Sequence, residues 1–317
     1  MAIAISTEHQ VKNELSLVAQ REYVALTSSG SSALIVALKA SNIAPGSEVI
    51  MPAICCPAVL FAIQMAGFTP VLSDVSITTF CSTLADIEAQ VSDKTKAVIA
   101  VHSYGIACDI KAISEYCKSK QLLLIEDACL AVGAITNNQP LGSFGDISIY
   151  SFGYDKTLAL NYGGAIFTNN AALFSAIEAT LNVNDFFCYQ PNDGNIQRLK
   201  GALDELGDFT AKRINNVLFC HQQLQTEHIS KPTIDVDQPL WRYPLIINGD
   251  RERFLAKADA KNILITSHYK SLEILKTGTT LPQAKYISDH VINIFVRPET
   301  PQQQIEDTVH FINEFAQ

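Results

Sequence analysis

The stretch from Lys96 to Asp127, KAVIAVHSYGIACDIKAISEYCKSKQLLLIED, decides the fold. It contains two short apolar segments, Lys96–His102 and Gln121–Glu126, which lack the alternation of a half-exposed strand. The residues between them, Asp109–Ser119, have helical spacing, and Asp109 is placed to cap the first turn. A buried strand, a helix and a second buried strand predict parallel strands covered by a helix.

The same pattern continues on both sides of this stretch. Apolar strands are predicted at Glu48–Pro52, Thr69–Asp74, Asp146–Phe152 and Gly164–Thr168, with helices at Cys56–Ala66 and Thr83–Val91. We therefore expect an α/β fold, in which a mostly parallel sheet lies between two layers of helices.

The second half of the chain differs in character. Asn182–Gly207 is polar and predicts an irregular excursion, and Thr226–Pro239 is rich in Pro and Asp and predicts a linker. A smaller α/β unit is expected beyond it, with strands at Trp241–Ile247 and Val291–Val296 and helices at Arg251–Ala260 and Gln303–Phe315. The predicted domains are residues 1–235 and 236–317.

Composition excludes several classes of protein. The chain has 317 residues, enough for about two domains, and 48% hydrophobic residues exclude a disordered chain. A net charge of −9 argues against nucleic-acid binding, and no apolar run reaches the ~18 residues of a membrane span.

The amino-terminal residues and the cysteines bear on location and metal binding. The amino-terminal residues lack the pattern of a secretory signal, so we expect a cytoplasmic protein with eight reduced cysteines. No metal site is expected, because no two cysteines are spaced C-x2-C and no histidine stands at ligand spacing from them.

Ligands of open α/β sheets bind at the carboxyl ends of the parallel strands, and three features of the sequence fall there. The run TSSGSSAL, residues 27–34, opens a helix whose free N–H groups would suit a phosphate, with donors from Ser29 or Ser31. The alternative is an ordinary serine-capped helix. Asp127 directly follows a buried strand, where it would pair with a cationic ligand nitrogen or merely cap the next turn.

The third feature is Lys156, in a short loop between two predicted strands and followed by Gly163-Gly164. A partly desolvated lysine can form an imine with a carbonyl, whereas most lysines are solvated surface residues. Taken together, a phosphate site, a carboxylate and a lysine in this order indicate pyridoxal 5'-phosphate (PLP), with one group for each part of the cofactor.

In these three features and in the motifs around them, the chain resembles the DegT/DnrJ/EryC1/StrS family of PLP-dependent sugar aminotransferases. The run TSSGSSALIVALKASNIAPGSEVIMPA is similar to the family's S-G-T-x-A-L … G-D-E-V-I-x-P segment, and AGFTPVLSDV to A-G-A-x-P-V-x-x-D. KAVIAVHSYGIACDI, IEDACLAVGA, LGSFGDISIYSF and DKTLALNYGGAIFTN continue the likeness. It covers residues 21–182 well, is weak through 183–240, and returns at TSHYKSL and LPQAKYISDHVINIFVRP.

The resemblance implies roles for particular residues. Lys156 matches the lysine that binds the cofactor aldehyde, and Asp127 matches the carboxylate paired with the ring nitrogen. Gly30-Ser31 and Ser151 match the phosphate-binding positions, next to Ser29. The family implies a fold-type-I enzyme that acts as a homodimer. It transfers an amino group, usually from glutamate, to a keto sugar linked to a nucleotide.

Two positions of the cofactor site depart from the family pattern. Leu130 stands where a Gln or His usually lies near the cofactor hydroxyl, and Cys56 stands where an aromatic ring usually stacks. Two alternatives therefore stay open. One is another PLP reaction on the same fold, such as a lyase or dehydratase, although the family's dehydratases replace the lysine with His and this chain keeps Lys156. The other is a binding or regulatory homologue without turnover.

Overall fold

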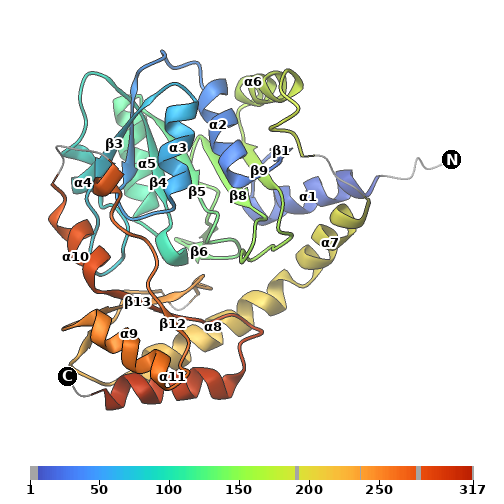
Figure 1. The fold of residues 1–317 in the computed structure, drawn as a ribbon. Helices are drawn as coiled ribbons and strands as arrows, with labels where there is room; N and C mark the ends of the chain where they lie inside the picture. Colours follow the sequence, from blue (N-terminus) through green and yellow to red (C-terminus); the bar gives the residue numbers. More distant parts are fainter. Residues whose placement is uncertain (1–5, 190–192, 236, 276–279, 316–317) are drawn as a thin grey trace.

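The computed structural model describes residues 6–189, 193–235, 237–275 and 280–315. Its main feature is a seven-stranded sheet in the order β1-β9-β8-β5-β4-β2-β3, seen in the upper half of Figure 1. Only β9 runs against its neighbours, so the sheet is mostly parallel, as predicted. Its strands are β1 (Tyr23–Thr27), β2 (Glu48–Pro52), β3 (Thr69–Ser73), β4 (Thr95–Val101), β5 (Leu123–Asp127), β8 (Ile147–Ser151) and β9 (Gly164–Thr168).

Helices cover both faces of this sheet because its strands are buried on both sides. Met51 and Ile99 pack into the apolar layer under α2 (Gly30–Ala40), α3 (Pro57–Met65) and α6 (Ala171–Asn182). Their neighbours Ile50 and Val98 point the other way, toward α1 (Thr7–Ala19), α4 (Leu84–Glu88), α5 (Ile110–Lys120) and α7 (Asp193–Asp204). A short hairpin, β6 (Ile135–Thr136) and β7 (Gln139–Pro140), lies between β5 and β8 in the chain.

The strand–helix–strand unit between Lys96 and Asp127 forms as expected. Asp109 caps α5, since its carboxylate accepts a hydrogen bond from the N–H of Ala112 at 3.4 Å. The second strand begins at Leu123 instead of Gln121, because Gln121 has a positive φ of 55° that ends the helix. The unit therefore places Asp127 as the last residue of its strand.

The predicted irregular excursion at Asn182–Gly207 is wrong. Helix α7 occupies 193–204, and α8 (Leu206–Gln223) begins within the same segment. Three apolar residues of α7, Ile196, Leu199 and Leu203, are buried at helical spacing, and the helix packs against α1. The prediction followed the polar composition of the segment. The spacing of its few apolar residues is the better guide, because these residues form the face that the helix buries.

The rest of the chain builds a second, antiparallel sheet in the order β10-β11-β13-β12. It is covered by α8 and the helices that follow, in the lower half of Figure 1. Strand β10 lies inside the expected linker, and the boundary at 235/236 stays a prediction. No helix within the described ranges is both long and apolar enough to cross a membrane. The elements are β10 (Ile229–Ser230), β11 (Tyr243–Ile247), α9 (Arg251–Ala260), β12 (Ile265–Thr266), α10 (Pro282–His290), β13 (Val291–Ile294) and α11 (Gln302–Glu314).

Candidate active site

The carboxyl ends of three adjacent strands, β4, β5 and β8, form one side of a cleft. Asp127 is the last residue of β5, and Lys156 lies on the loop after β8. Both line this cleft, whose enclosed volume is about 30 Å³. Cys56, His102, Leu130 and Tyr269 contribute to the same lining.

The amino-terminal end of α2 approaches this cleft through Gly30. A Cβ atom at Gly30 would lie 2.9 Å from the Cβ of Ser151, closer than packing allows, and 3.3 Å from the Sγ of Cys129, which is a tight contact. Ser29 is the N-cap, and its hydroxyl accepts a hydrogen bond from the N–H of Ser32 at 3.0 Å. The Ser31 hydroxyl has no hydrogen bond with any residue that the structure describes. The fold thus brings the amino-terminal end of α2 against Ser151, whereas Ser29 and Ser31 line a separate cleft with Met65 and Phe186.

The pair Gly163-Gly164 makes this approach possible from the other side. A Cβ at Gly164 would lie 2.8 Å from the carbonyl carbon of Ser29 and 2.9 Å from the nitrogen of Gly30. Gly163 has a φ of 105°, in the region that favours glycine, and its N–H donates to the Ser28 carbonyl at 2.9 Å. Because neither glycine has a side chain, the start of β9 packs directly against the amino-terminal end of α2.

Asp127 is held in place by the backbone that follows it. It is 6% exposed, and its Oδ1 accepts a hydrogen bond from the N–H of Cys129 at 3.0 Å. The pKa of the Cys129 thiol is raised well above its usual value by burial first and by the charge of Asp127 second, whereas Lys156 acts in the opposite direction. The Asp127 carboxylate and the Lys156 amine therefore both lie close enough to Cys129 for their charges to act on its thiol.

His102, which lines the cleft, forms a fully buried pair with Glu126. His102 and Glu126 are both 0% exposed, and His102 Nε2 lies 3.1 Å from Glu126 Oε1. The N–H of Cys108 donates to His102 Nδ1 at 3.3 Å, so Nε2 carries the hydrogen and donates to the carboxylate. Burial works against ionisation of Glu126, but hydrogen bonds from His102 and from the N–H groups of Gly142 and Gly145 outweigh it and lower its pKa. This pair was not predicted from the sequence, although His102 ends one predicted strand and Glu126 directly precedes Asp127.

The loop that carries Lys156 is fixed by the second sheet. Asp155 has a φ of 65°, and its carboxylate pairs with both Arg242 and Arg297. The Nε1 of Trp241 donates to the Asp155 carbonyl at 2.7 Å. The Lys156 side chain is partly exposed and forms no ion pair within the described residues.

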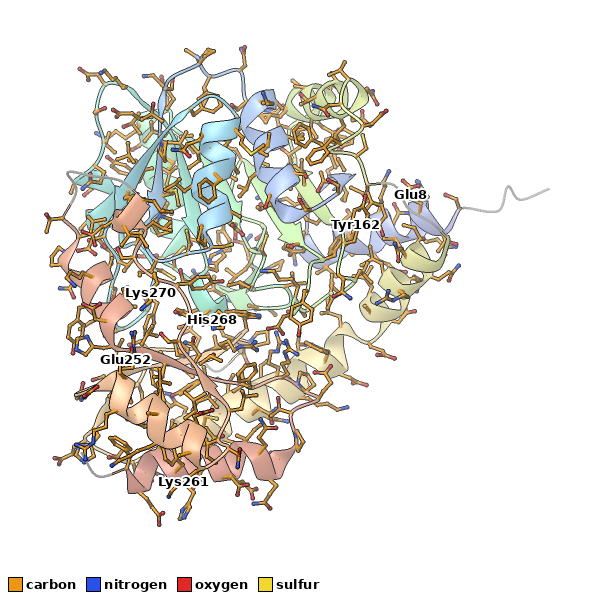
Figure 2. All side chains as sticks on the ribbon, in the orientation of Figure 1. Glu8, Tyr162, Glu252, Lys261, His268 and Lys270 are labelled. Atoms are coloured by element: carbon orange, nitrogen blue, oxygen red, sulfur yellow. The ribbon has the colours of Figure 1, made fainter. Side chains whose placement is uncertain are left out.

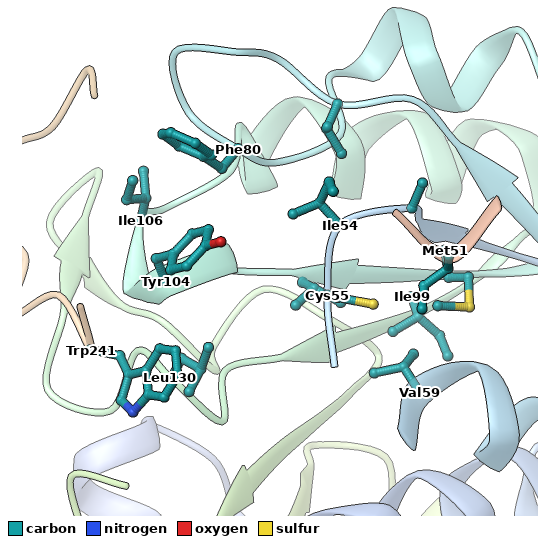
Figure 3. Packing of buried hydrophobic residues seen from close by; sticks show 14 of the residues in the cluster. Met51, Ile54, Cys55, Val59, Phe80, Ile99, Tyr104, Ile106, Leu130 and Trp241 are labelled. Atoms are coloured by element: carbon teal, nitrogen blue, oxygen red, sulfur yellow. The ribbon is translucent and has the colours of Figure 1, made fainter. Parts of the chain in front are cut away.

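The two positions that depart from the family pattern both line the cleft. Cys56 is exposed at the N-cap of α3. Leu130 is buried, beside Trp241 in Figure 3. An aromatic ring reaches the cleft from another place, because Tyr269 comes from the segment after β12, with its ring 6.0 Å from that of Trp241. His268, next to it in sequence, lies between the two sheets in Figure 2.

Several known proteins are similar to this chain in sequence or in fold. The chain is 39% identical over 301 residues to the UDP-N-acetyl-3-dehydro-alpha-D-glucosamine 3-aminotransferase of Acidithiobacillus ferrooxidans, across 87% of this chain and 80% of that protein. It is 39% identical over 153 residues to the GDP-perosamine synthase of Escherichia coli O157:H7, which is 48% of this chain and 42% of that protein.

A solved structure of NtdA from Bacillus subtilis with bound cofactor PMP superposes with a TM-score of 0.86 and 25% identity. The superposition covers 98% of this chain and 78% of that one. A sequence model of the DegT/DnrJ/EryC1/StrS aminotransferase family matches residues 6–189, more than half of the chain. The chain therefore belongs to the DegT/DnrJ/EryC1/StrS aminotransferase family.

Proposed function

We propose that this chain is a PLP-dependent aminotransferase that moves an amino group from an amino acid, glutamate in the first instance, to a keto group on a nucleotide-linked sugar. The observation that carries the proposal is the meeting of Lys156 and Asp127 in one cleft. The relatives named above act on sugars of this class by their names, which supports the choice of acceptor.

The side chains and backbone at the cleft fit PLP. The amino-terminal end of α2 offers backbone N–H groups that Gly30 brings against Ser151, where they would hold the cofactor phosphate. Asp127 is a nearly buried carboxylate that would hold a proton on the ring nitrogen. Lys156 supplies a primary amine with no competing ion pair among the described residues.

The roles of the residues follow from this fit. When bound, the cofactor supplies an aldehyde that captures amines and a ring that accepts negative charge. Lys156 would take the proton from the α-carbon of the amino donor and return it as general base and acid. Asp127 would keep the ring nitrogen protonated throughout, and the residues at the end of α2 would hold the phosphate still.

A second candidate is a binding or regulatory protein that keeps the cofactor without turnover. Leu130 favours it, because an aliphatic side chain cannot donate a hydrogen bond to the cofactor hydroxyl. Cys56 favours it as well, because a thiol covers less of the ring than an aromatic side chain.

We also propose that the enzyme is a cytoplasmic homodimer. The cleft next to Ser29 and Ser31 is bordered by Met65, which is 63% exposed, and Phe186, which is 75% exposed. Exposed apolar side chains gathered at a binding cleft are typical of surfaces that a second chain covers. The eight cysteines are all unpaired, which supports a reducing compartment.

The test is the visible absorbance of the purified protein with PLP, before and after excess L-glutamate. Lys156→Ala should abolish the band of the bound cofactor, and Lys111→Ala, an exposed lysine on α5, serves as the matched control. In the wild type and the control, glutamate should shift the band. A band that depends on Lys156 but stays unmoved by any amino acid would favour the second candidate. No band at all would refute the cofactor.

A further inference from the structure

A second, larger cleft lies on the other side of the loop that carries Lys156. Its volume is about 310 Å³, and Lys156 lines it as well as the smaller cleft. Its other walls come from helix α8, through Phe209 and Arg213, and from the segment after β13, through Arg297. A molecule in this cleft would therefore contact the same lysine from another direction.

Arg213 is the unusual feature of this cleft. It is 1% exposed, and its Nη1 donates to the hydroxyl of Thr157, the neighbour of Lys156, at 3.3 Å. The ring centre of Phe209 lies 4.7 Å from its Cζ. Its Nε has no hydrogen-bond partner, and no carboxylate lies within ion-pair distance among the described residues. Burial lowers the pKa of Arg213 to about 10, although the charge of Glu299 acts in the opposite direction, so Arg213 is protonated at neutral pH. A buried charge with one neutral hydrogen bond is costly unless an anion completes it.

The charged residues around Arg213 indicate which class of anion would bind in this cleft. Arg242 and Arg297 share a single carboxylate, that of Asp155, so the inner wall carries an excess of positive charge. The exposed residues Glu205 and Glu299 also line the cleft, toward solvent. An acidic outer part favours a ligand whose carboxylates are accompanied by a cationic amine, as in glutamate, over a more highly charged anion such as a nucleoside diphosphate.

The position of Lys156 indicates which anionic group of the ligand would bind next to Arg213. In the proposed reaction, Lys156 acts at the α-carbon of the amino donor, and the α-carboxylate is one bond from that carbon. A group that binds this carboxylate must therefore lie beside the lysine, and Arg213 is hydrogen-bonded to the residue next to it. The planar fork of a guanidinium matches a carboxylate in two parallel hydrogen bonds.

We propose that Arg213 binds the α-carboxylate of the amino donor in the cleft between α8 and the Lys156 loop. The proposal rests on the function proposed above and names the residue that recognises its first substrate. Arg213 would orient the donor so that its α-carbon faces Lys156, and Arg297 would add a second positive charge nearby.

The experiment combines two titrations of the holoenzyme. The first follows the cofactor band with L-glutamate. The second follows the fluorescence of Trp241, the only tryptophan, with glutarate, a carboxylate that lacks the amine. Trp241 is hydrogen-bonded to Asp155 on the wall of this cleft, so its emission should report occupancy. The variants are Arg213→Met, Arg213→Lys and the control Arg198→Met, an exposed arginine on α7.

Arg213→Met should weaken both titrations roughly 10- to 100-fold, the range expected for a charged hydrogen bond. Arg213→Lys should weaken them less, and Arg198→Met should leave them unchanged. Because Arg213→Met risks misfolding, its circular dichroism is compared with the wild type, and Arg213→Lys carries the test if it fails. Equal affinities in the wild type and both Arg213 variants would overturn the proposal. Saturation by UDP that depends on Arg213, with no response to glutarate, would also overturn it. Glutarate binding that depends on Arg213, together with a cofactor band unmoved by glutamate, would keep the anion site and refute the proposed transfer.

Discussion

Glu126→Gln tests whether the buried carboxylate beneath the cleft stabilises the fold. In the wild type this carboxylate accepts hydrogen bonds from the N–H groups of Gly142 at 2.6 Å, Phe144 at 2.8 Å and Gly145 at 3.0 Å, in addition to that of His102. The substitution keeps the shape of the side chain but removes its charge. It also replaces one acceptor oxygen with an NH₂ group that faces donors.

The size of the effect follows from these contacts. If the amide nitrogen faces Phe144 and Gly145, two buried N–H groups lose their acceptor, and each costs about 1–3 kcal/mol. If it faces His102 and Gly142, two donors are lost there instead. We therefore expect Glu126→Gln to lower the free energy of unfolding by about 2–6 kcal/mol at pH 7.

The assay is urea unfolding between pH 7 and pH 3.5, followed by circular dichroism. The folded-state pKa of Glu126 lies below its ordinary value of 4.5, so its contribution is complete above that pH and is lost as the pH falls through the folded value. The difference between wild type and variant should thus be constant from pH 7 to about 5 and shrink below about 4.5. Glu115→Gln, an exposed residue on α5, is the matched control and should change little. A loss below about 1 kcal/mol for Glu126→Gln at pH 7 would refute the reasoning.

Three further predictions concern the cleft itself. Gly164→Ala should weaken PLP binding at least tenfold, about 1.4 kcal/mol, because the new Cβ would push against the backbone of Ser29; an unchanged dissociation constant in a spectral titration would contradict this. Asp155→Asn should lower the stability by about 3 kcal/mol in urea unfolding, since Arg242 would lose its buried partner; a stability equal to that of the wild type would exclude a role for the pair. Bound PLP should slow alkylation of Cys56 by iodoacetamide, measured by peptide mass spectrometry, because this exposed thiol lines the cofactor cleft; equal rates with and without PLP would place the cofactor elsewhere.

The parts of the site that the sequence predicted are those that lie at strand ends. Asp127 and Ser151 each end a buried parallel strand, so their meeting follows from the rule that such ends share one edge of the sheet. Tyr269 could not be placed in this way, because it comes from an irregular segment of the second sheet and reaches the cleft only through the packing of the two sheets. Arg213 was missed for a related reason. It lies near the segment predicted as a loop, and a charged residue on a helix is usually exposed.

The position of Lys156 depends on residues that lie far away in the sequence. Asp155 directly precedes it and is held by Arg242, Arg297 and the indole of Trp241, all from the second sheet or its flanks. A rotation of the second sheet relative to the first would therefore displace the lysine, whereas Asp127 and the end of α2 belong to the main sheet and would stay. In the proposed enzyme, the main sheet would therefore hold the ring nitrogen and the phosphate of the cofactor, whereas the second sheet would set the position of the lysine. A substitution in the second sheet should accordingly change the reactivity of the amine before it changes the affinity for the cofactor.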